Sequence, residues 1–167
     1  MKTSHGVTLA VSAIAILLSA PLTKAQISDN NPDLVEVRHY RLTMDKVQAA
    51  ADASEQVNAL IASNPELKKR VDADSGDETI DQKAKRFDTS FPDVAAIVRR
   101  NGLSTREYVV VTLALMNDYM LVGMKKQGSI KEYPPNAITP ENAAFVEQNF
   151  DKLKVLIDKM TPPDQAN

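Results

Sequence analysis

The chain has 167 residues, enough for one domain, and its 20 basic and 22 acidic side chains give a formal net charge of −2. This balance argues against the basic face that binding to nucleic acid or to an anionic membrane requires. The absence of cysteine excludes disulfides, thiolate zinc sites, the Cys-x-x-Cys-His attachment of c-type haem and a lipid anchor on cysteine.

The first 25 residues have the pattern of a cleavable secretory signal peptide. Residues 7–20 (VTLAVSAIAILLSA) follow a lysine-containing start and hold no charged side chain. As a helix they would span about 21 Å, well short of the ~30 Å core of a bilayer. Small residues at Thr23 and Ala25 favour cleavage between Ala25 and Gln26. We therefore expect residues 1–25 to be removed and the protein to be secreted, or periplasmic in a Gram-negative bacterium.

The chain that this cleavage would leave is more acidic and poorer in metal ligands. Losing two lysines leaves 18 basic side chains against 22 acidic ones, and His39 becomes the only histidine. One histidine cannot make a multi-histidine metal site. The most apolar stretch, residues 108–124, carries Asn117 and Asp118 in its middle, which is costly in lipid. We expect a soluble domain with no cofactor, no metal, no nucleic-acid partner and no membrane insertion after signal removal.

Residues 26–42 are predicted to form a polar leader followed by a short extended segment. Residues 26–33 (QISDNNPD) are polar and rich in turn formers. Residues 34–42 (LVEVRHYRL) show the partial alternation and β-branched side chains typical of a strand. No second segment would pair with it, so no sheet is expected.

Helical signals dominate residues 43–161. Thr43 can cap a helix that runs to about residue 63 with one apolar stripe. Short helices are predicted over about 65–71 and 79–88, and a third starts at Pro92 and ends before Gly102, which suits the left-handed position after a helix.

Two long helices complete the predicted domain. A capping box, Ser104-Thr105-Arg106-Glu107, opens the most apolar helix of the chain, over about 105–126. The last helix begins at Thr139-Pro140, carries apolar residues at alternating spacings of 4 and 3, and ends before a loose tail at 162–167. The fold class is therefore all-α: an irregular bundle of three long and two or three short helices, with the 105–126 helix central and buried.

Asp118 is the most conspicuous polar residue, because it lies in that central helix. A buried carboxylate must find a partner or change its pKa, and such positions are enriched at functional sites. One interpretation is a polar ligand-binding pocket that includes Asn117 and Tyr119. The other is structural: Asp118 pairs with an arginine or lysine of a neighbouring helix, or it lies on an edge that reaches solvent.

Met116, Met120 and Met124 form a stripe at i, i+4 and i+8 on the same helix. Flexible methionine surfaces can bind varied apolar partners. The same spacing is also typical of plain core filling. Together with Asn117, Asp118 and Tyr119, the three methionines make up the candidate ligand-binding residues.

The sequence offers no catalytic pattern. It contains no Gly-x-Ser-x-Gly elbow. The acidic segment 72–78 (DADSGDE) does not match a calcium loop, because counting from Asp72 puts Gly76 at position 5 instead of 6 and Lys83 at position 12, where a glutamate is needed. We therefore predict no catalytic residue, no metal site and no enzymatic activity.

Two motifs carry resemblances to known proteins. Leu42-Thr43 before a helix resembles the Leu-Thr-x-x-Gln repeat of periplasmic stress chaperones, although position 46 is lysine and no second copy occurs. More broadly, Gly102-Leu103-Ser104 and Pro140-Glu141-Asn142 resemble turns and caps of small exported bacterial all-helical proteins of unknown function. That resemblance implies a fold and no activity.

The function that these features favour is a non-enzymatic binding module of the cell envelope. Its partner would be an envelope protein, a peptide or an apolar small molecule. The alternatives are a chaperone-like periplasmic stress protein and an enzyme or cofactor carrier centred on Asp118.

Overall fold

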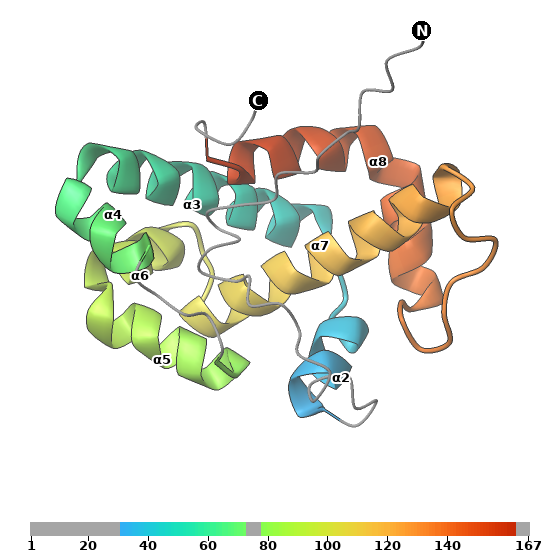
Figure 1. Ribbon diagram of the computed structural model, residues 1–167, viewed down its shortest axis with the longest axis horizontal. Helices are drawn as coiled ribbons and strands as arrows, with labels where there is room; N and C mark the ends of the chain where they lie inside the picture. The colour runs from blue at the N-terminus through green and yellow to red at the C-terminus, as the bar shows by residue number, and fades with distance from the viewer. Residues whose placement is uncertain (1–30, 73–77, 163–167) are drawn as a thin grey trace, which may run out of the picture.

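The computed structural model describes residues 31–72 and 78–162, and the predicted signal peptide with its cleavage site, most of the acidic segment and most of the tail lie outside them. Across the described residues the structure contains seven helices and no strand (Figure 1). The helices are α2 (Pro32–His39), α3 (Met44–Ser63), α4 (Pro65–Asp72), α5 (Ile80–Ser90), α6 (Pro92–Arg100), α7 (Thr105–Lys126) and α8 (Pro140–Met160). They pack into one helical bundle, as the sequence predicts. None of these helices is both long enough and apolar enough to cross a membrane.

The prediction of an extended segment over residues 34–42 is wrong, because most of it belongs to α2. The Asn31 side chain accepts a hydrogen bond from the Asp33 amide at 3.0 Å, and Pro32 occupies the first helical position. Arg38 and His39 complement the dipole at the other end. These end signals outweigh the β-branched residues between them. With α2 added, the described chain has four short helices, where two or three were expected.

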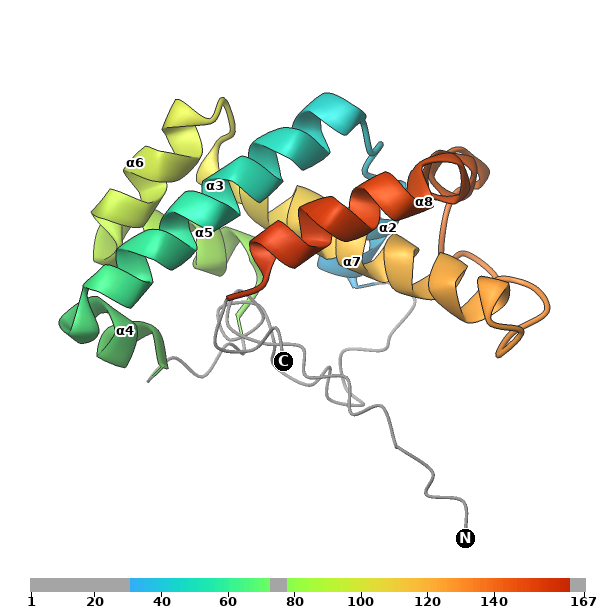
Figure 2. The same ribbon diagram turned by 90° about the horizontal axis from the view of Figure 1, so that it is seen from above.

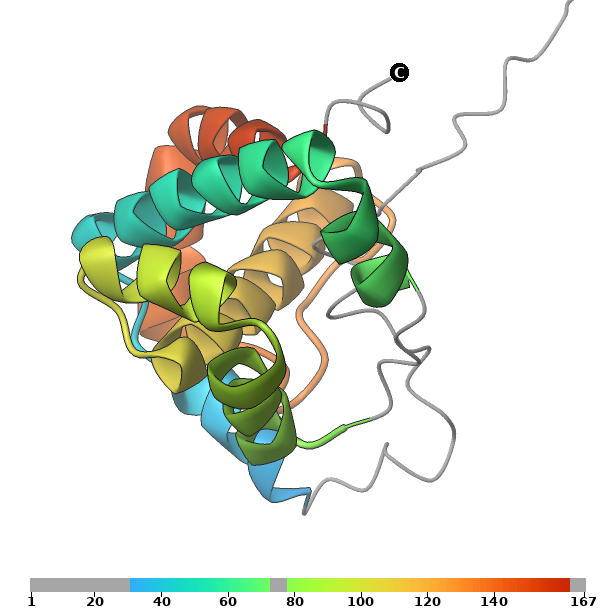
Figure 3. The same ribbon diagram turned by 90° about the vertical axis from the view of Figure 1, so that its left-hand side faces the viewer.

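The longest helix, α7, lies at the centre of the bundle. It packs against α2, α3, α5, α6 and α8, and Figures 1 and 3 show α3 and α8 on one side of it and α2 and α5 on another. Side chains with no exposed surface follow it over most of its length: Val109, Val111, Ala114, Leu115, Asp118 and Val122. The prediction of one central buried helix is therefore confirmed.

The turn into α7 has the predicted geometry. Gly102 has a φ of 81°, its amide donates to the carbonyl of Arg99 at 3.0 Å, and the Leu103 amide donates to the carbonyl of Val98 at 3.3 Å. This pair of bonds is a Schellman ending for α6. Ser104 then caps α7 by accepting from the Glu107 amide at 3.0 Å.

Helix α8 changes direction near its middle, as Figures 1 and 2 show. Its first half lies beside the C-terminal end of α7, and its second half runs along α3, where Asn58 Nδ2 donates to the carbonyl of Met160 at 3.1 Å. Within α8, Asn149 Nδ2 donates to the carbonyl of Phe145 at 2.8 Å, a side-chain bond of the kind that competes with the helical ladder. The bend lets one helix contact both α7 and α3.

Candidate functional site

Asp118 has no exposed surface, and both of its carboxylate oxygens accept hydrogen bonds from side-chain amides. Asn117 Nδ2 donates to Oδ1 at 2.9 Å, and Asn142 Nδ2 donates to Oδ2 at 2.8 Å. The expected ion pair with a neighbouring arginine or lysine is absent from the described residues, and so is the expected exposed edge. Two neutral amides satisfy the carboxylate instead.

Asn142 is the centre of this buried cluster. It lies in the first turn of α8, where its amide donates to the capping hydroxyl of Thr139 at 3.2 Å. Its Nδ2 donates to the carbonyl of Tyr40 at 2.8 Å as well as to Asp118, and its Oδ1 accepts from the Leu42 amide at 3.1 Å. One side chain therefore ties the connection between α2 and α3 to both α7 and α8.

The sequence contains a signal for this role of Asn142 that cap reasoning misses. Asn142 precedes Val146 by four residues, so it extends the apolar seam of α8 back by one turn. It is 1% exposed. A polar residue at such a position is buried in the core and needs a hydrogen-bond partner there, and the partner of Asn142 on α7 is Asp118.

Burial raises the pKa of the Asp118 carboxyl to about 6, while the hydrogen bonds from Asn117 and Asn142 act in the opposite direction. A carboxyl that titrates near neutral pH has the proton affinity of a general base. A base must also reach its substrate, and no surface of Asp118 is open to solvent. The arrangement therefore favours a structural role over proton transfer to a ligand.

Tyr119 is not part of this cluster. Its ring stacks on that of Phe150 from α8, with centroids 4.3 Å apart and planes 10° from parallel. The Lys126 ammonium lies over the Phe150 ring, with its Nζ 5.0 Å from the ring centre. The structure thus separates Tyr119 from Asn117 and Asp118 and places it beside the methionines.

The methionine stripe is not core filling along its whole length. Met116 is half-buried, but Met120 is 57% exposed and Met124 is 36% exposed. We call Met116, Met120 and Met124, with the stacked pair Tyr119 and Phe150 beside them, the methionine face. Met120 and Met124 are four residues apart, so their exposed side chains are neighbours on one face of α7.

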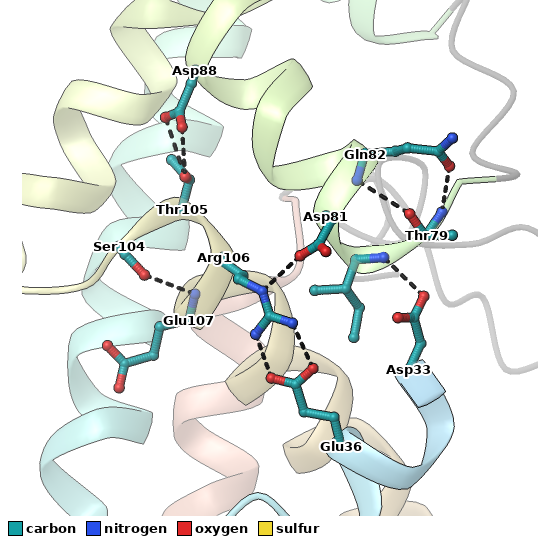
Figure 4. Close-up of polar contacts among 11 residues, drawn as sticks. Asp33, Glu36, Thr79, Asp81, Gln82, Asp88, Ser104, Thr105, Arg106 and Glu107 are labelled. Carbon is teal, nitrogen blue, oxygen red and sulfur yellow. Dashed lines mark hydrogen bonds and ion pairs between the residues drawn. The ribbon is translucent and has the colours of Figure 1, made fainter. Parts of the chain in front are cut away.

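At the other end of α7, a polar cluster fastens two short helices to it (Figure 4). Arg106 contacts both carboxylate oxygens of Glu36 on α2, with Nη2 to Oε2 at 2.7 Å, and its Nε donates to Asp81 of α5 at 2.7 Å. Asp33 of α2 accepts from the first amide of α5, that of Ile80, at 3.0 Å. These charges are used within the fold, so the cluster does not offer Arg106 to a ligand.

A second set of contacts explains why the predicted capping box is only half formed. The Glu107 carboxylate accepts from Tyr40 Oη at 3.1 Å and pairs with Lys46 of α3 at 2.9 Å. Burial and the neighbouring Glu107 raise the pKa of Tyr40 well above its usual value. Glu107 thus joins the start of α3 and the end of α2 to α7.

The fold and these clusters define an all-helical bundle stabilised by buried polar contacts, with one exposed methionine face. Within the described ranges, no three histidine or acidic side chains gather as metal ligands would. No protein-family model matches the chain, and no match was found among curated proteins or among solved structures.

Proposed function

We propose that the chain is an exported, non-enzymatic interaction module of the cell envelope whose methionine face binds an amphipathic helix of a partner protein. The observation that carries this proposal is the exposure of Met120, which is 57% on the helix that otherwise forms the core. Fully burying an exposed methionine side chain contributes about 1.5–3 kcal/mol, and the exposed part of Met120 would contribute a fraction of this at an interface. Its unbranched, polarisable chain adapts to differently shaped apolar partners.

A helical partner fits the spacing of the methionine face. Met116, Met120 and Met124 follow one another at intervals of four residues, so they form a row about 12 Å long on one side of α7. Apolar residues at helical spacing are what an amphipathic helix recognises.

Crosslinking in living cells tests the interaction. A photoreactive residue is placed at Met120 and, as a matched control, at Val155, an isolated apolar residue of α8 that is 59% exposed. We expect one defined adduct from position 120 and none from position 155, and we expect Met124→Lys to abolish the adduct. Equal labelling from both positions, or no adduct from position 120, would refute the methionine face as a binding site.

The export part of the proposal has a separate test. The intact mass of the protein from the envelope fraction is measured and compared with the mass expected for a chain that begins at Gln26. Recovery of the full-length mass from the cytoplasmic fraction would refute export and leave the binding proposal to be tested on its own. Suppression of the aggregation of unrelated proteins would favour the chaperone alternative over a dedicated partner.

A further inference from the structure

Four segments of the chain meet at the buried Asp118 carboxylate. Besides α7, α8 and the connection between α2 and α3, the connection before α8 is held there through Asn117. Asn117 Nδ2 donates both to Asp118 Oδ1 at 2.9 Å and to the carbonyl of Ala137 at 3.0 Å. The same amide group therefore contacts the carboxylate and the connection over residues 127–139.

The two amides differ in their freedom to respond when the carboxylate gains a proton. Asn142 cannot rotate without losing its bonds to Leu42 and Tyr40, because its Oδ1 accepts from one and its Nδ2 donates to the other. Its N–H therefore continues to require Oδ2 as an acceptor. The proton is then added to Oδ1, which faces the N–H of Asn117. The new O–H and this N–H are both donors, so they cannot form a hydrogen bond with each other.

We propose that Asp118 is a proton-sensitive latch. In the ionised state its Oδ1 holds Asn117 against Ala137. On protonation it releases Asn117, and with it the part of the connection around Ala137, while Asn142 stays in place. The latch goes beyond the proposed binding role and does not depend on it.

The local electrostatics place this event in an accessible pH range. Burial raises the pKa of Asp118 to about 6, and only the two amides oppose that shift. No cation or second carboxylate contributes to it. The charged or titratable side chains on the segments around Asp118 include His39, Tyr40, Arg41, Asp45, Lys46, Arg106, Glu107, Tyr119, Lys125, Lys126, Lys131, Glu132, Tyr133, Glu141 and Glu147.

Among these, the side chain that needs a control is His39, since histidine ordinarily titrates in the same range. His39 is exposed and adjoins Tyr40, whose carbonyl belongs to the cluster. Glu107, the nearest acid on α7 toward its start, is 11 residues away, or about 16 Å along the helix axis. The variant His39→Gln removes the imidazole and leaves the Asp118 contacts unchanged.

Nuclear magnetic resonance on the unmodified exported protein tests the latch between about pH 4 and pH 8. The Asp118 carboxyl carbon, the Asn117 side-chain amide, the Ile138 backbone amide and the Asn142 side-chain amide are followed together. We expect the first three to shift with one midpoint near that of Asp118, and the Asn142 amide to keep its hydrogen-bonded position. Relative to the intrinsic exchange rate at each pH, amide exchange around Ala137 should increase below the midpoint by about tenfold, corresponding to one lost hydrogen bond.

The proposal can be refuted by measurements on the wild type and on His39→Gln, without any substitution at Asp118. A midpoint for Asp118 at the value usual for aspartate, about 4, would show that the carboxylate does not respond near neutral pH. An Asn117 or Ile138 signal that is independent of the Asp118 midpoint would show that no latch exists. Loss of the transition in His39→Gln would assign it to the histidine.

Discussion

Asn142→Ala is the substitution that the structure predicts to be most damaging outside the apolar core. The change removes three hydrogen bonds: the bond to Asp118, the bond to the Tyr40 carbonyl and the bond from the Leu42 amide. Asp118 and Leu42 are buried, with Leu42 3% exposed, and Tyr40 is half-buried. Alanine offers no replacement partner.

The magnitude follows from what each orphaned group loses. A bond to a charged group contributes about 1.5–3 kcal/mol, and leaving a buried neutral donor or acceptor unpaired costs about 1–3 kcal/mol. These costs overlap because one relaxation can serve several groups, so we expect a loss of about 3–5 kcal/mol in the free energy of unfolding. That is a large part of the 5–15 kcal/mol typical of a whole domain.

Urea unfolding followed by circular dichroism measures this loss. The matched control is Asn149→Ala in the same helix, where the side chain makes one bond to a helix carbonyl at 2.8 Å. We expect the control to change stability by about 1 kcal/mol or less. If the two variants lose the same stability, or if Asn142→Ala loses less than about 1 kcal/mol, the cluster does not hold the four segments together and the reasoning is refuted.

Four further predictions concern single residues. Gly123→Ala should stabilise the protein by about 0.5–1 kcal/mol in urea unfolding, because Gly123 is inside α7 and an added Cβ would lie 3.7 Å from Phe150 in ordinary contact; Gly102→Ala should destabilise by about 1–2 kcal/mol, because its φ is 81°. Arg106→Gln should cost about 1 kcal/mol at low ionic strength and less in 1 M salt, since its partners are exposed carboxylates. Finally, burial raises the pKa of Asp118 to about 6 in the folded protein, so its contribution to the free energy of unfolding is fully present below pH ~4 and is lost as pH rises through about 6. Urea unfolding should therefore show that the wild type loses about 3 kcal/mol relative to Asp118→Asn between pH ~4 and pH ~7.

The helices are well specified by their end signals. Thr43, Thr79, Ser104 and Thr139 each cap a helix through a side-chain oxygen. These contacts span three residues, so the sequence contains all of the information that they need. Helix α2 also has local end signals, since Asn31 caps it and Pro32 occupies its first turn. The β-branched residues that follow are typical of a strand, and giving them more weight than these signals leads to the wrong prediction of an extended segment.

The long-range partner of Asp118 could not be predicted in the same way. That partner is Asn142, 24 residues later, and the bond forms only because the bend of α8 and the packing of α7 bring the two side chains together. Sequence reasoning correctly required a partner for a buried carboxylate, but charge complementarity suggested a cation. An amide satisfies the carboxylate while also bonding two backbone groups, which the ammonium of lysine, with no acceptor, cannot do.

The methionine face shows a different limit. Helix α7 is apolar on nearly all sides, so its sequence does not show which side is left uncovered by the other helices. That depends on where the other helices pack, and the helices that contact α7 leave Met120 57% exposed. The exposure of Met120 is therefore a property of the bundle, and the same side chains that would fill a core are left available to a partner.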